Sequence, residues 1–336
     1  MADSTYTFDV IAVGDTTQDI FLQMTDASVQ CDIDGHNCRL CFDYAEKIAV
    51  DAKTDISAVG NAANNAIGVA RLGLRSAIYS IVGDDEQGRL SQEVFEENKV
   101  DTRYLAFDKK HGTNLSMVIN FKTERTIFVY HEPRIYKLPD LELSKWIYLT
   151  SASGEGVRTL HGQVLAYLSQ HPEVSLAFNP GTYQIKLGLE ELQPLFQRTQ
   201  LLFLNTEESM RILGVKTRDI PKLMKSFHAL GVKWMVITDG PKGAYFSDGA
   251  SLSFQGIFDG PVVERTGAGD AYGSGFLSAI IHGKTAVEAM CWGDANSTSV
   301  VGYVGAREGL LTQDKLETLI KNNNSILPQP YDSTHH

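Results

Sequence analysis

Residues 264–280 read E-R-T-G-A-G-D-A-Y-G-S-G-F-L-S-A-I, a group of small, turn-compatible residues followed by the apolar run of a buried helix. The first backbone N–H groups of such a helix have no partner within it, and the helix dipole adds partial positive charge there. Gly267 and Gly269 lack a Cβ, so a phosphate can approach the backbone closely. The pattern therefore predicts that Gly267, Ala268 and Gly269 form an anion hole for a phosphoryl group.

Asp270 directly follows this turn. A carboxylate in that place can act as a general base, taking the proton from an acceptor hydroxyl as the hydroxyl attacks the γ-phosphate of a nucleotide. The alternative is a glycine-rich turn before a core helix, with Asp270 as a capping acid. Short glycine patterns occur in both settings, so these residues alone leave both interpretations open.

A second stretch, residues 60–73, reads G-N-A-A-N-N-A-I-G-V-A-R-L-G. The two stretches, in this order, resemble the two signatures of the ribokinase-like (PfkB) carbohydrate kinases. The resemblance implies an α/β fold with a doubly wound, mainly parallel sheet flanked by helices and a small β-structured lid. It also implies an ATP-dependent kinase that uses magnesium and phosphorylates a hydroxyl of a sugar or sugar-like small molecule, with Asp270 as the base.

The resemblance extends to residues that would bind the acceptor. Asp19 matches the family's sugar-binding aspartate, and a carboxylate that accepts two hydroxyl hydrogen bonds orients a polyol well. A solvated turn acid is the alternative for Asp19. In the first signature, Gly60, Asn61 and Asn64 match positions at the substrate. The family usually has two glycines before this segment, whereas Val59 stands in place of the first one here.

The resemblance also implies metal sites. Asn205 with Glu208 matches the family's N-x-x-E, which helps to order magnesium and phosphate, often through water. Magnesium keeps much of its hydration shell, so a site with few protein ligands is chemically reasonable. The same two residues suit a helix N-cap with an acidic first turn, and both roles can hold at once. Many family members bind a monovalent cation beside the anion hole, where Glu264 stands in place of their aspartate; potassium dependence stays open.

Two further segments match the family's nucleotide site. Thr238, Gly240 and Gly243 belong to the stretch T-D-G-P-K-G, which resembles the family's nucleotide loop, with small residues around the phosphates and ribose. Asn296 falls in a helix rich in small residues that matches the region where the family holds adenine. Tight core packing also favours small residues on a helix, which is the alternative for this segment.

Composition limits the class of protein. The chain has 336 residues, of which 43% are hydrophobic, and we expect one large α/β domain. Its formal charge of −11 arises from 41 acidic and 30 basic residues, without a basic cluster, which argues against a nucleic-acid surface. The N-terminus does not resemble a signal peptide, and the chain shows no apolar run long enough to span a bilayer. We expect a soluble, cytoplasmic protein without nucleic-acid or membrane partners.

The 4 cysteines do not suggest a disulfide framework in a chain of this size, so reduced thiols are expected. Cys31, Cys38 and Cys41 nevertheless lie close together with His36 between them. These side chains are of the types that hold zinc tetrahedrally, but their spacing is irregular and there is no second C-x-x-C. An insertion with reduced, idle cysteines is therefore expected, with a zinc site as the alternative.

Apolar runs predict the strands of the sheet and of the lid. A hairpin with one wet face is expected at residues 115–121 and 125–130, and the longer lid at about 16–57 and 111–131, with strands at F-L-Q-M and K-I-A-V. Buried strands are expected at residues 8–13 and 77–82 and at the runs that begin with Trp146, Val174, Leu201 and Trp234.

The lid builds a dimer in some family members, so a homodimer through the lid is implied. We expect a single kinase domain over residues 1–325 and a loose C-terminal tail over 326–336, where Pro, Asn and Ser recur.

Two alternatives to a sugar kinase remain. A nucleoside kinase on the same fold would need an aromatic surface over the acceptor, which Tyr183, Tyr130 or Phe121 can provide. A member that binds sugar or nucleotide without catalysis is the more remote alternative, because such a protein has no need for Asp270 beside an intact glycine turn.

Overall fold

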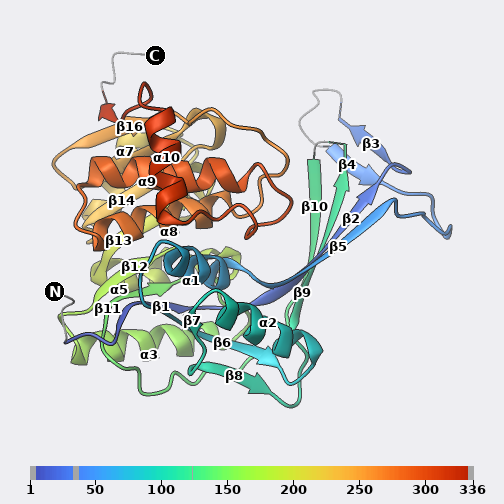
Figure 1. Cartoon of the computed structure of the whole chain (residues 1–336), viewed down its shortest axis with the longest axis horizontal. Helices are drawn as coiled ribbons and strands as arrows, with labels where there is room; N and C mark the ends of the chain where they lie inside the picture. Colours follow the sequence, from blue (N-terminus) through green and yellow to red (C-terminus); the bar gives the residue numbers. More distant parts are fainter. Residues whose placement is uncertain (1–4, 33–37, 123, 332–336) are drawn as a thin grey trace.

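The computed structural model describes residues 5–32, 38–122 and 124–331 (Figure 1). Its main sheet has 11 strands, and every pairing from β7 through β14 is parallel, while β15 to β17 are antiparallel. The strand order is β17-β16-β15-β14-β13-β12-β11-β1-β6-β7, with β8 beside β6. This arrangement confirms the predicted fold class. The strands are β1 (Phe8–Val13), β6 (Ser76–Gly83), β7 (Val100–Asp101), β8 (Leu105–Asp108), β11 (Ser144–Leu149), β12 (Ser175–Phe178), β13 (Thr199–Asn205), β14 (Trp234–Thr238), β15 (Ala244–Ser247), β16 (Leu252–Gln255) and β17 (Gln329–Pro330).

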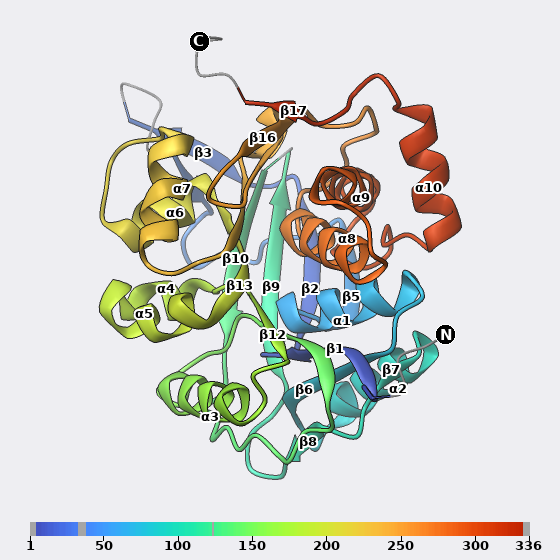
Figure 2. The same ribbon diagram turned by 90° about the vertical axis from the view of Figure 1, so that its left-hand side faces the viewer.

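Helices cover both faces of this sheet (Figure 2). One face carries α1 (Asn61–Arg71), α8 (Ala268–Ile281), α9 (Ala286–Val300) and α10 (Gln313–Asn322). The other carries α3 (Val157–Gln170), α4 (Thr182–Leu187), α5 (Leu189–Arg198), α6 (Thr206–Leu213) and α7 (Ile220–Ala229). A further helix, α2 (Glu86–Glu97), packs beside β5, β6 and β7.

The alternation of side chains along each strand divides the core between these two layers. Ile11 of β1 lies in the cluster under α3, α5 and α7, whereas its neighbour Val10 lies in the cluster under α8 and α9. All six residues of β1 are buried, which is why its sequence is almost continuously apolar. Parallel strands buried on both faces bring their carboxyl ends to one edge, where α1, α6 and α8 begin.

A second sheet of four strands projects from the body (Figure 1). It consists of β2 (Thr17–Met24), β5 (Ala52–Val59), β9 (Asn114–Phe121) and β10 (Glu124–Tyr130), in the order β10-β9-β2-β5. The predicted F-L-Q-M strand lies within β2, and the predicted hairpin is β9 with β10. The predicted K-I-A-V strand is wrong: residues 47–50 pair with no described strand, and β5 begins only at Ala52. The action of this sheet as a lid stays a prediction.

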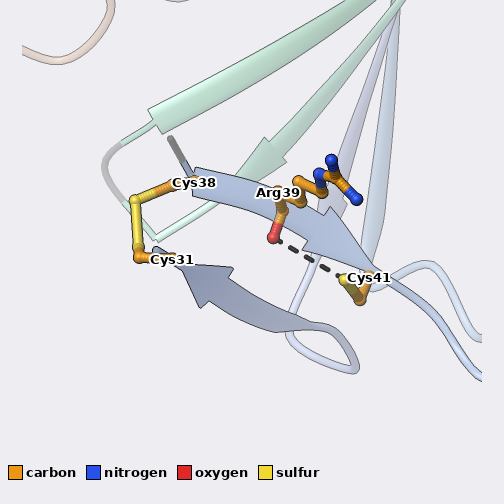
Figure 3. Close-up of a disulfide and its surroundings, with 4 residues drawn as sticks. All are labelled: Cys31, Cys38, Arg39 and Cys41. Atoms are coloured by element: carbon orange, nitrogen blue, oxygen red, sulfur yellow. Dashed lines mark hydrogen bonds between the residues drawn. A yellow bond between two sulfur atoms is a disulfide. The ribbon is translucent and has the colours of Figure 1, made fainter. Parts of the chain in front are cut away.

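At the tip of this sheet, β3 (Ser28–Cys31) and β4 (Cys38–Cys41) form a hairpin in which Cys31 and Cys38 are joined by a disulfide (Figure 3). The expectation that both thiols are reduced is therefore wrong. The two residues are directly opposite in the antiparallel register, where their side chains meet, and spacing in the sequence does not reveal this register. The disulfide removes two of the candidate zinc ligands, and His36 lies outside the described residues. Cys41 is a free thiol.

The C-terminal segment is also more ordered than expected. Residues 329–330 form β17, which pairs with β16, and the backbone N–H of Tyr331 donates to the carbonyl of Leu252 at 2.9 Å. The ring of Tyr331 packs edge-on against Tyr245, with centroids 5.5 Å apart. The prediction of a loose tail from residue 326 is thus wrong up to Tyr331, because backbone pairing and this ring contact hold the segment to the sheet.

Among the described helices, none combines the length and apolar character needed to cross a membrane.

Candidate active site

The glycine turn before α8 has the geometry that its sequence predicts. Gly267 is the N-cap residue in the left-handed region, with φ 78°, and a Cβ there would lie 2.2 Å from the Cβ of Ala306. Only glycine fits this position without a shift of the backbone. A Cβ on Gly269 would meet nothing within 4 Å, because Gly269 borders open pocket space. The start of α8 therefore faces a cavity with its unpaired N–H groups and its positive dipole end.

Asp270, in the first turn of α8, is held by two amides from the start of α1. Asn61 Nδ2 donates to Oδ1 at 2.9 Å, and Asn64 Nδ2 donates to Oδ2 at 2.8 Å. Burial raises the pKa of Asp270 to about 6, although the two amide hydrogen bonds act in the opposite direction. A carboxylate with this pKa is ionised at neutral pH and is a stronger proton acceptor than an ordinary aspartate.

Two pockets meet at this turn. The smaller, of about 310 Å³, is lined by Asp270, Asn61, Glu208 and Arg125 among others. The larger, of about 440 Å³, extends over β14, the loop after it and α9. Residues that line both pockets are Asn205, Thr238, Arg265, Ala268, Gly269 and Tyr272. A group bound at the junction can thus face the α8 N-terminus while its two sides lie in separate cavities.

The predicted nucleotide residues line the larger pocket, with one exception. Thr238, Gly240 and Gly243 all border it. Asn296 does not: its Nδ2 donates to the carbonyl of Ala271 and to the Ser274 hydroxyl at 3.0 and 3.1 Å, so the side chain ties α9 to α8. The side chain of Asn296 is therefore engaged between the two helices, and its role at the nucleotide stays a prediction.

The pocket face of α9 instead carries Asp294, Ser297 and Thr298. The helix is buried on most of its circumference, so its sequence has no apolar stripe that distinguishes the two faces.

Asn205 and Glu208 form a reciprocal cap at the start of α6. Asn205 Oδ1 accepts from the Glu208 N–H at 2.8 Å, and Glu208 Oε2 accepts from the Asn205 N–H at 2.9 Å. Burial raises the pKa of Glu208, which also lines the smaller pocket. Its Oε1 takes part in no hydrogen bond with the described part of the chain, and hard oxygen donors of this kind suit magnesium. The cap and a water-mediated magnesium contact are therefore compatible.

The carboxylate of Glu264 is occupied by hydrogen bonds within the protein and is not open to a cation. Its Oε1 accepts from both the N–H and the hydroxyl of Thr266, and its Oε2 accepts from the Gly305 N–H at 3.4 Å. Arg125 Nη1 lies 3.4 Å from the same carboxylate. Donors and a guanidinium already surround this group, which does not fit a monovalent cation at the carboxylate.

The predicted acceptor residues gather around Asp270. Asp19, on β2, is buried, and this burial raises its pKa to about 6; the Ser116 hydroxyl lowers it, while the charges of Glu264 and Asp270 raise it. Gly60 is the N-cap of α1 with φ 97°, and a Cβ there would lie 3.0 Å from the Asp15 carbonyl. The fold thus brings together residues that are far apart in the sequence, and their contacts with a substrate stay predictions.

The sequence reasoning missed two arginines that line the smaller pocket. Arg125 comes from β10, where its neighbours along the strand are exposed, and Arg265 directly precedes the glycine turn. The sequence signal for Arg265 was its position beside the anion hole, and for Arg125 its place in a lid hairpin. Asn179, in the loop after β12, also lines this pocket.

Comparison with known proteins agrees with this geometry. Residues 31–313 match the family model described as pfkB family carbohydrate kinase. The chain belongs to this family. It is thus a phosphotransferase with an alcohol group as acceptor, which confirms the predicted family and enzyme class.

Relatives of this pfkB family chain differ in the substrates they are named for. The ATP-dependent 6-phosphofructokinase of Thermoanaerobacterium thermosaccharolyticum is 27% identical over 279 residues, covering 77% of this chain and 84% of the relative. The nucleoside kinase of Methanocaldococcus jannaschii is 26% identical over 264 residues, covering 76% and 83%. Arabidopsis thaliana ribokinase complexed with ribose and ATP superposes with a TM-score of 0.77 at 20% identity, covering 94% of this chain and 99% of that one. Relatives at similar identity are thus named for both sugar-type and nucleoside acceptors.

Proposed function

We propose that the protein is an ATP-dependent kinase that transfers the γ-phosphate to a hydroxyl of a sugar or sugar-like small molecule. The observation that carries the proposal is the position of Asp270. It lines the smaller pocket, directly after Ala268 and Gly269, which border both pockets, and its carboxylate has a raised pKa. Family membership and relatives named as kinases for sugars and nucleosides support the same reaction.

In this proposal the nucleotide occupies the larger pocket with its phosphates toward Gly269, and the acceptor occupies the smaller pocket beside Asn61. Asp270 accepts the proton of the attacking hydroxyl, and the amides of Asn61 and Asn64 keep its two oxygens oriented. The backbone of residues 267–269 stabilises the negative charge on the phosphoryl group during transfer. Arg265 and Arg125 border the same space and add positive charge to it.

Magnesium bound through water at Glu208 would neutralise part of the phosphate charge, as expected for a phosphoryl transfer enzyme. The sheet of β2, β5, β9 and β10 would act as the lid, because Arg125 of β10 reaches the pocket and Asp19 of β2 lies near the base. Exclusion of water by such a lid strengthens the electrostatic interactions in the site and limits hydrolysis of ATP.

A nucleoside is the second candidate acceptor, and one contact favours it. The ring of Tyr183 packs edge-on against His131, with centroids 5.4 Å apart, and His131 Nδ1 lies 3.7 Å from Asp15. This pair offers an aromatic surface next to a polar cluster at the carboxyl end of β1. The other two aromatic candidates suit this less well, because Phe121 is buried in the lid sheet and Tyr130 is 58% exposed on β10.

Release of ADP from ATP in the presence of magnesium tests the proposal, with ribose, fructose, 2-keto-3-deoxygluconate, adenosine, inosine, guanosine and cytidine as acceptors. Turnover on one acceptor class is expected in the wild type, with a loss of roughly a hundredfold or more in Asp270→Asn because the general base is removed. Near-wild-type turnover in Asp270→Asn would show that another group is the base.

A further inference from the structure

Asp294 is a buried carboxyl that the proposed reaction does not use. It lies in the middle of α9, is only 6% exposed, and lines the larger pocket. Tyr272 and the loop around Phe258 are its neighbours there. A carboxyl group with so little access to water is costly unless a donor satisfies it.

Among the described residues, a hydrogen-bond donor reaches only one of its two oxygens. Oδ2 accepts a hydrogen bond from the backbone N–H of Phe258 at 2.7 Å. No hydrogen bond reaches Oδ1 from the described residues, while the side chain borders the cavity. Burial raises the pKa of Asp294 to about 7, and the Phe258 N–H lowers it only in part. Oδ1 is therefore an unused acceptor that faces the space available to a ligand.

This part of the pocket suits the base of a nucleotide. The phosphate end is fixed by Gly269 and Arg265, which the two pockets share. Ile257, Val262 and Val301 line the larger pocket but not the smaller one, and apolar side chains of this kind enclose a flat, weakly polar ring. Asp294 also lines only the larger pocket, and the other acidic side chain there, Glu207, comes from the start of α6.

We propose that Asp294 determines the specificity for the phosphate donor, with Oδ1 accepting a hydrogen bond from the exocyclic amino group at C6 of a purine. The inference rests on the proposed function, in that the larger pocket is taken to hold the nucleotide. Adenine presents an N–H donor at C6. Hypoxanthine presents a carbonyl oxygen there, and two acceptor oxygens, this one and Oδ1, would then face each other without a hydrogen between them. Polar sites of this kind discriminate strongly because a mismatched ligand leaves a buried group unpaired.

Asp294→Asn tests the inference because it reverses the polarity of the hydrogen bond. The Phe258 N–H requires an acceptor, so the amide oxygen of Asn would take the place of Oδ2 and the NH₂ group would face the pocket. The variant is expected to lose affinity for adenine nucleotides and to gain it for hypoxanthine nucleotides. In a buffer above the raised pKa of Asp294, the ratio of kcat/KM for ATP to that for ITP should fall by about tenfold or more.

Binding of ADP and IDP, measured by calorimetry, gives a second readout that needs no acceptor. Wild-type protein is expected to prefer ADP, and Asp294→Asn to shift that preference toward IDP. Asp248→Asn, at an exposed acid in the turn between β15 and β16, serves as the matched control and should leave both ratios unchanged. If Asp294→Asn weakens both nucleotides by the same factor, the carboxyl only positions the Phe258 loop and the inference is wrong. Preference for ADP without turnover on any acceptor would instead contradict the proposed function and leave the role of Asp294 standing.

Discussion

Replacement of Asn64 by Ala should change the pH dependence of catalysis in a defined direction. Asn64 donates to Asp270 Oδ2 at 2.8 Å, and this hydrogen bond lowers the pKa of a carboxyl that burial raises to about 6. Hydrogen bonds to charged groups contribute about 1.5–3 kcal/mol, which corresponds to about one to two pKa units. Water can enter the vacated space and replace part of the bond, so an upward shift of about one unit is expected.

The assay is the pH profile of kcat/KM, whose acidic limb reports the pKa of the base in the free enzyme. In the wild type the limb is expected at about 6, and in Asn64→Ala at about 7. The rate on the alkaline plateau should change much less, because the base is ionised there in both proteins. Asn65→Ala is the matched control: Asn65 is the next residue of α1, is fully buried and makes no described hydrogen bond with Asp270.

The predicted contact of Asn64 with the acceptor gives a different result. If that contact is its only role, KM for the acceptor rises at every pH and the acidic limb stays where it is. An unshifted limb in Asn64→Ala, or an equal shift in Asn65→Ala, would refute the assignment of Asp270 as a base held by this amide.

Further predictions concern the glycine turn and the ion pair between Asp9 and Arg75. Gly267→Ala should lower stability by about 1–3 kcal/mol because of its positive φ and the clash with Ala306, whereas Gly269→Ala should keep the melting temperature and lose nucleotide affinity, since its Cβ would enter the pocket. Burial would raise the pKa of Asp9, but hydrogen bonds with Arg75 hold it at about 2, so Asp9→Asn should cost about 1–2 kcal/mol at neutral pH. That difference should be present above the unfolded pKa and disappear as the pH falls toward about 2, which urea titrations at several pH values can measure.

Features that depend on local sequence were predictable. The T-G-A-G-D turn needs glycine at residue 267 for a positive φ, and this requirement is visible in the sequence as a glycine before an apolar helix. The six apolar residues of β1 likewise indicate a strand buried on both faces. In both cases the conformation follows from the residues next to it in the sequence and, for β1, from burial of the sheet between two layers of helices.

Features that depend on strand register or on the rotation of a helix about its axis could not be predicted from the sequence. The Cys31–Cys38 disulfide follows from a hairpin register that no turn motif fixes. Asn296 and Asp294 lie two residues apart on a helix buried almost all round, so the sequence does not show which of them faces the pocket. Residues 47–50 are apolar enough for a strand, yet a strand forms only where a partner lies alongside.

The carboxyls of this protein divide into two groups by their surroundings. In Asp9 and Asp108 hydrogen bonds outweigh the effect of burial and lower the pKa of each to about 2. Asp9 is bonded by Arg75, and Asp108 by the backbone N–H of Lys110 and by His111, so both carboxylates contribute to stability at neutral pH. Asp19, Asp270 and Asp294 lie at or near the two pockets, where burial raises the pKa of each. Burial without a cation costs stability at neutral pH, and hydroxyl or amino donors of a bound ligand can offset that cost. The carboxyls of the second group therefore lower the stability of the free protein and are available for binding and catalysis. Substitutions at these residues are the ones that test the proposed function most directly.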